Sequence, residues 1–229
     1  MTGRARVGSL GQGRPPHERS CSSLITLVPA ALLLWSQAAA AHIPQLSGKL
    51  VDCISHSDVI VAGTVDQVTD VTNRIVETTL KVEHVLAGEV AVPSVTFRGG
   101  ARFAPHERYV VFLRRASGAF EGVQAAGTLF NSRPQDDGEY QQAIDSVRAA
   151  LRAPPDAQVD RLRAALIPAL RAAPQPLRYH AALELAALAH HGPLNADNRQ
   201  VLAALVADPG FDPALRPLVT ALLQPQSKE

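Results

Sequence analysis

Between residues 58 and 132 the chain alternates apolar and polar side chains with the two-residue period of a β-strand. Within 76–83 the even positions are apolar or threonine, and the odd positions are charged or threonine. Residues 109–113 read YVVFL and are apolar on both faces, as in a central strand. Roughly five to six such runs, separated by glycines, predict a small β-barrel or sandwich. Its core is predicted to include Val61, Val65, Leu80, Val82, Val111 and Leu113.

From about Gly138 the pattern changes to Ala, Leu and Arg residues with the 3.6-residue period of helices. Short helices at intervals of roughly 20 residues resemble HEAT-like helical pairs, with a generic helical bundle as the alternative. Residues 178–191 are apolar almost all round, which predicts a central, buried helix. Upstream, 46–55 is predicted as a short amphipathic helix that covers the barrel. The helical segments are predicted at 139–152, 156–172, 177–191, 196–207 and 213–223, with Asp156, Asn195 and Asp212 as N-caps.

The beginning of the chain has the composition of a secretory signal. Four arginines precede an apolar run at 24–35, and Ala38–Ala41 follows it. The run is about 12 residues long, short of the roughly 20 needed to cross a bilayer. We therefore expect cleavage after Ala41, which leaves His42 as the mature terminus, and a secreted or periplasmic location.

Charge and cysteine content limit the possible partners and cross-links. The predicted signal contains four Arg and one Glu, so the 22 basic and 21 acidic residues of the chain become 18 and 20, a net charge of −2. This balance gives no support to a nucleic-acid partner. Cys21 lies in the signal, so Cys53 is the one cysteine of the mature chain and no intramolecular disulfide is expected.

Three stretches of the β-region resemble a family of secreted bacterial β-domains. They read SDVIVAGTV at 57–65, LKVEHVLAG at 80–88 and, after Gly99-Gly100 and Arg102-Phe103, ERYVVFL at 107–113. The order is also similar to netrin-like modules, as in tissue inhibitors of metalloproteinases, and this resemblance implies an OB-type barrel. Those inhibitors carry disulfides and an N-terminal zinc-binding Cys, whereas this chain has His42 there. His106 stands where the bacterial family tends to have Gly.

Pattern and resemblance together predict an α+β protein. A signal peptide at 1–41 is followed by a β-rich OB-like or netrin-like domain with an N-terminal helix at 42–135. A short α-helical domain, HEAT-like or a bundle, follows at 136–229. The boundary is placed in the polar, turn-rich segment 133–138.

Two clusters invite a catalytic or metal-binding interpretation. Cys53 and His56 are close in sequence, which suggests a thiol nucleophile beside an activating imidazole. Cys53 falls on the apolar side of the predicted helix, so a structural role is favoured and no catalytic residue is assigned. His180 and Glu184 are one helical turn apart, a spacing that suits a metal. No third ligand from another element is indicated, so no metal site and no cofactor are predicted.

The arginines around the Gly99-Gly100 loop are the candidate binding residues. Guanidinium groups and loop N–H groups suit an anion, and the set comprises Arg98, Gly99, Gly100, Arg102 and Arg108. The sequence thus predicts a non-catalytic binding protein whose partner is a protein or cell-envelope component, with no transmembrane segment after cleavage. The alternatives are a hydrolase or thiol enzyme using Cys53 and His56, and a metal-binding protein using His42.

Overall fold

The computed structural model describes residues 50–124 and 129–224, which belong to a single compact unit. The predicted signal peptide, Cys21 and His42 lie outside the described residues, as does the first part of the helix predicted at 46–55. The remainder of that helix is present as α1 (Leu50–Ser55).

Five strands form a closed barrel, which confirms the predicted barrel architecture. Neighbouring strands are antiparallel in the order β4-β1-β2-β3, which is a Greek key, and β5 closes the barrel by pairing with β4 and, in parallel, with β3. This is an OB-like arrangement. A short strand, β6 (Phe130–Asn131), pairs with the start of β4. The barrel strands are β1 (Val59–Asp70), β2 (Val76–Ala87), β3 (Ser94–Gly99), β4 (Arg108–Ala116) and β5 (Ala119–Gly122).

The barrel interior contains the predicted core. Five of the six predicted residues have no exposed surface, and Val82 is half-buried against the same cluster. Aromatic side chains complete it, with Phe103 in edge contact with Phe97 at 5.7 Å and with Tyr109 at 5.1 Å between ring centroids. The period-two pattern therefore predicted correctly which side chains face the interior, because one face of each strand points into the closed barrel.

Two glycines of the barrel are required by the backbone. A Cβ at Gly63 would lie 2.1 Å from the Lys81 carbonyl oxygen, where β1 is bulged against β2. Gly88 has φ of 77°, and a Cβ there would lie 2.3 Å from the Asp58 carbonyl oxygen. These positions allow close strand approach and a left-handed turn, so they specify the fold.

The helical region follows the predicted order. A 3₁₀ turn, η1 (Pro134–Asp136), leads into it, and a second, η2 (Pro168–Arg171), interrupts the segment predicted at 156–172 because Pro168 lacks the N–H that a continuing helix needs. The central helix α4 has a largely buried surface, as predicted. The helices are α2 (Asp137–Leu151), α3 (Pro155–Leu166), α4 (Gln175–Ala189), α5 (Ala196–Ala207) and α6 (Arg216–Leu223).

One of the three predicted N-caps is confirmed. The Asn195 side chain accepts a hydrogen bond from the Asn198 amide at 2.8 Å. The prediction for Asp156 is wrong, because Pro155 already starts α3 and its fixed φ suits the first helical position. The prediction for Asp212 is also wrong, since its carboxylate accepts from the Ala214 amide in a turn before α6 begins.

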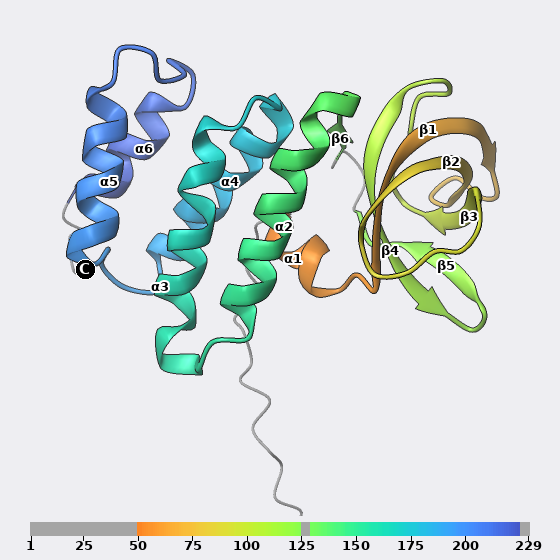
Figure 1. The fold of residues 1–229 in the computed structure, drawn as a ribbon, viewed down its shortest axis with the longest axis horizontal. Helices are drawn as coiled ribbons and strands as arrows, with labels where there is room; N and C mark the ends of the chain where they lie inside the picture. Colours follow the sequence, from red (N-terminus) through yellow and green to blue (C-terminus); the bar gives the residue numbers. More distant parts are fainter. Residues whose placement is uncertain (1–49, 125–128, 225–229) are drawn as a thin grey trace, which may run out of the picture. The chain divides into compact units, whose positions relative to one another are not determined.

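A second core runs from the outer wall of the barrel through the helices. It includes Ile60, Val110, Phe112 and Phe130 from the strands, the buried face of α1, and apolar residues from α2 to α6. Figure 1 shows α1 between the barrel and the helices, which form a layer of α2, α3 and α5 with α4 and α6 behind. We call this barrel–helix contact zone the seam. The doubly apolar run 109–113 is explained by it, because alternate residues face the two cores.

Candidate binding site

A groove crosses the barrel surface where β3 and β5 meet. Only two residue pairs, Phe97–Phe120 and Arg98–Glu121, join these strands. The β4–β5 turn borders the opening, and the cavity has a volume of ≈ 540 Å³. That volume lies within the range of small-molecule and peptide pockets. The lining residues are Glu77, Thr96, Phe97, Arg98, Ala116, Ser117, Ala119, Phe120 and Glu121.

The aromatic ring of Phe120 lines the groove and is contacted by a neighbouring cation. The Arg115 guanidinium carbon lies 5.4 Å from the centroid of the Phe120 ring, a cation–π contact. Arg115 is held in place because its Nη2 donates to the Glu89 carbonyl at 2.7 Å and its amide donates to Asp58 at 2.7 Å. Phe120 is therefore positioned before any ligand arrives.

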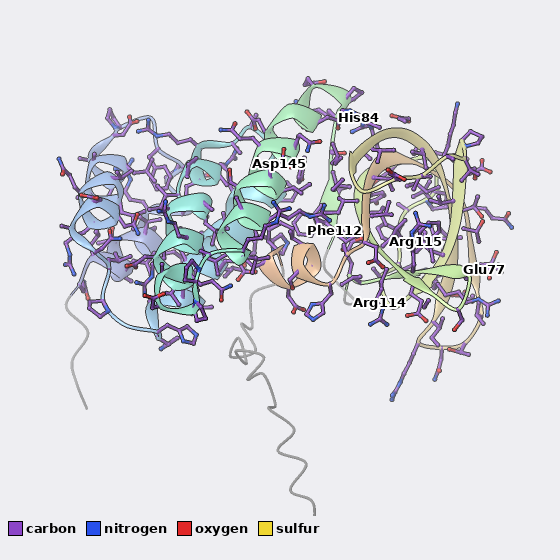
Figure 2. All side chains as sticks on the ribbon, turned by 60° about the horizontal axis from the view of Figure 1, so that its bottom comes forward. Glu77, His84, Phe112, Arg114, Arg115 and Asp145 are labelled. Carbon is purple, nitrogen blue, oxygen red and sulfur yellow. The ribbon has the colours of Figure 1, made fainter. Side chains whose placement is uncertain are left out.

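Two arginines near the groove are paired with carboxylates. Arg98 donates to Glu77 at 2.8 Å, and Arg114 donates to Glu121 at 2.7 Å. Thr79 and Thr96 share a hydrogen bond of 3.0 Å on the neighbouring strand surface. Figure 2 shows Glu77, Arg114 and Arg115 on the barrel, and Phe112 at its side toward the helices. The result is a surface rich in donors and acceptors, with two ion pairs and the Arg115 cation beside them.

The predicted binding arginines lie in three different environments. Arg98 lines the groove, while Arg102 makes two hydrogen bonds to Asp70, at 2.5 and 3.2 Å, on the barrel surface. The hydrogen bond from Arg102 holds the pKa of Asp70 below its usual value. A Cβ added at Gly99 would lie 3.4 Å from the Cα of Gly122, and Gly100 is exposed. An anion at this loop would therefore have to compete with a carboxylate for each guanidinium.

Arg108 joins the barrel to α2 instead of facing the groove. Its side chain is 11% exposed, and its guanidinium donates to both oxygens of Asp137, at 2.8 and 2.7 Å. Nε donates to Glu83 at 2.8 Å and Nη1 to Ser132 at 2.8 Å. Hydrogen bonds from Thr64 and then Arg108 lower the pKa of Glu83. The Asp137 partner was not predicted, since nothing in the sequence shows that the first turn of α2 meets β4.

The groove residues contributed by β5 were also missed. The run 120–124 has only weak strand character, and its parallel pairing with β3 has no local signal. Pattern analysis could place Arg98 on a strand, but it could not place Phe120 beside it. The pairing becomes visible only when the barrel closes.

Cys53 and His56 occupy different surroundings. Cys53 is 3% exposed and belongs to the core at the seam. His56 is exposed, with Nδ1 3.1 Å from an Asp52 carboxylate oxygen and 2.9 Å from the Asp52 carbonyl oxygen. A substrate could reach the thiol only if the packing of α1 opened.

His180 and Glu184 are both buried on α4 and contact different elements. The His180 ring lies 4.6 Å from the ring of Phe130, and Glu184 Oε1 accepts from the Val51 amide at 2.9 Å. Within residues 50–124 and 129–224 no group of three His, Cys, Asp or Glu side chains has the arrangement of a metal site. In the same ranges no helix is long and apolar enough to span a membrane.

No protein-family model and no curated protein matches this chain. The resemblance to secreted bacterial β-domains and netrin-like modules therefore stays a prediction.

Proposed function

We propose that the protein is an exported, non-catalytic binding protein that holds a protein or cell-envelope component in the groove between β3 and β5. The observation that carries the proposal is the groove itself, with its fixed Phe120 ring and its hydrogen-bonding rim. Binding sites combine an apolar surface with a few positioned polar groups, and the groove has both.

The chemistry of the rim favours a polar ligand of low net charge. Two of the three arginines near the groove have a carboxylate partner, Glu77 for Arg98 and Glu121 for Arg114, while Arg115 lies over Phe120 and donates to the Glu89 carbonyl. An anion at Arg98 or Arg114, or a cation at Glu77 or Glu121, would have to break one of these pairs, whereas hydroxyl or amide groups can bond to the unused lone pairs and N–H groups. Extended peptides and neutral glycans both meet this description, and the test below separates them.

The groove can be blocked at one exposed position. Ala119 is exposed on β5, and an arginine there would fill the groove without entering a core. The matched control is Ala204→Arg, the same change at an exposed site on α5. Both variants are compared with the unmodified protein as bait in envelope extract and on arrays of neutral glycans and extended peptides.

We expect Ala119→Arg to lose the captured ligand and Ala204→Arg to keep it. Equal capture by both variants would place the binding surface elsewhere and overturn the proposal. The export component is tested separately by N-terminal sequencing of protein from the extracytoplasmic fraction, where a terminus at His42 is expected. A cytoplasmic protein that retains Met1 would contradict it.

A further inference from the structure

Glu184 is a fully buried carboxyl at the seam. It lies on α4 with no exposed surface, and its Oε1 accepts a hydrogen bond of 2.9 Å from the Val51 amide in the first turn of α1. Its second oxygen, Oε2, makes no hydrogen bond within the part of the chain that the structure describes. One carboxyl oxygen therefore holds a helix, and the other lies in an apolar environment.

The contact matters because the first turn of a helix has N–H groups without helical partners. In α1 these groups are buried with Leu50 and Val51, each nearly inaccessible to solvent. Water cannot replace the carboxyl there, so the Glu184 side chain holds the start of α1 against α4. Losing this acceptor would leave a buried donor unsatisfied.

α1 in turn connects the barrel to the helical region. At its end, the Ser57 hydroxyl donates to the Cys53 carbonyl, and the Ser57 carbonyl accepts from Arg148 of α2 at 3.1 Å. Two residues later β1 begins. A change in the position of α1 would therefore affect the positions of both β1 and α2.

The arginines of the described helices near this site have partners other than Glu184. Asp52 on α1 is also acidic, and Arg148 on α2 is used by the Ser57 carbonyl. On α3, the Arg163 guanidinium donates to Leu188 and Gly192 carbonyls at the end of α4. His180, one turn earlier on α4, lies against Phe130. Arg163 forms its ion pair with Asp160, so both arginines are engaged by groups other than Glu184.

We propose that the Glu184–α1 contact is a protonation-dependent latch, in which the neutral carboxyl holds α1 in the seam and the ionised carboxyl releases it. Burial is the main cause that raises the pKa of Glu184 to about 7, the amides of Val51 and Leu50 oppose it, and Asp52 adds to it. The transition therefore falls near neutral pH, and it would change the contact between barrel and helices rather than the groove.

The latch is tested by NMR on the full chain between pH 5 and 8. We expect the Glu184 Cδ resonance to titrate with a midpoint near 7. The protection factor of the Val51 amide should fall at least roughly tenfold over the same range. Asp52→Asn should lower the midpoint, because it removes a neighbouring negative charge.

Substitution separates the latch from a general effect of pH. Glu184→Gln keeps an acceptor oxygen but cannot ionise, so its Val51 amide should stay protected throughout. Glu139→Gln is the matched control, since Glu139 accepts from the Ala173 amide on the surface, and it should behave like the unmodified protein. Two results would overturn the proposal. One is a Cδ midpoint near 4.5, which is measured in the unmodified protein. The other is a Val51 amide in Glu184→Gln that loses protection with rising pH as it does in the unmodified protein.

Discussion

The barrel interior and the seam are both apolar, yet they differ in what they bury with the apolar side chains. Inside the barrel the buried set is aliphatic and aromatic, with Thr78 from β2 as its buried polar residue. The seam and helical core bury charged and amide groups as well, including Glu184, Arg163 and Asp137. A sheet satisfies its own backbone, whereas helix ends need side-chain partners. Changes in pH and in single charges should therefore alter the stability of the protein mainly through the seam.

Neighbouring residues on β4 report on the two cores separately. Phe112 faces the seam and Leu113 faces the barrel interior, and both are fully buried. Phe112→Ala should lower the free energy of unfolding by about 3–5 kcal/mol, and Leu113→Ala by about 2–5 kcal/mol. In Phe112→Ala, hydrogen exchange should increase in α1 and α2 before it increases in the barrel. The exposed control Lys81→Ala should stay within about 0.5 kcal/mol in denaturant melts, and a near-neutral Phe112→Ala would show that the seam is not a core.

The pH dependence of stability should come from the seam. The pKa of Glu184 is raised to about 7 in the folded protein from an ordinary 4.5. Its contribution is therefore complete below pH 4.5 and is lost as the pH rises through 7. Relative to Glu184→Gln, the unmodified protein should lose about 3 kcal/mol between these limits. Parallel pH profiles of the two proteins in urea melts would contradict this assignment.

The Arg108–Asp137 pair should matter more than a similar pair on the barrel surface. Asp137→Asn leaves a nearly buried guanidinium with Glu83 as its remaining carboxylate, and the expected cost is about 2 kcal/mol. Asp70→Asn makes the same change in an exposed pair with Arg102, and no measurable loss is expected. Equal losses in thermal melts would mean that Arg108 does not tie the barrel to α2.

The smallest expected effect is a gain in stability from one substitution in the barrel. His106 has φ of 66°, in the left-handed region, where a glycine has no steric cost. His106→Gly should raise stability by up to about 1 kcal/mol, although added freedom of the unfolded chain offsets part of the gain. Gly118→Ala, where φ is 83°, is the control with the opposite sign. A destabilised His106→Gly would show that the imidazole makes a contribution beyond its backbone geometry.

The sequence predicted what depends on local periodicity. The alternation in β2 gave the correct face of Leu80, and the prolines and the change of period gave the order of the helices. Pairings between distant elements leave no such pattern. The groove needs β3 beside β5, and the Arg108 pair needs α2 beside β4, so Phe120 and Asp137 could not be assigned. The spacing of Glu184 from His180 is visible in the sequence, but the partner of Glu184 on α1 is 133 residues away and leaves no local signal.

We expect the seam to couple the unfolding of the barrel to that of the helices, across the predicted boundary at 135/136. Barrel and helices share a core that includes Phe112, Phe130 and α1, so unfolding one region should expose the apolar surface of the other. Differential scanning calorimetry of the purified protein tests this most directly. We predict one transition with equal calorimetric and van't Hoff enthalpies. Two separate transitions, one for the barrel and one for the helices, would contradict a shared core.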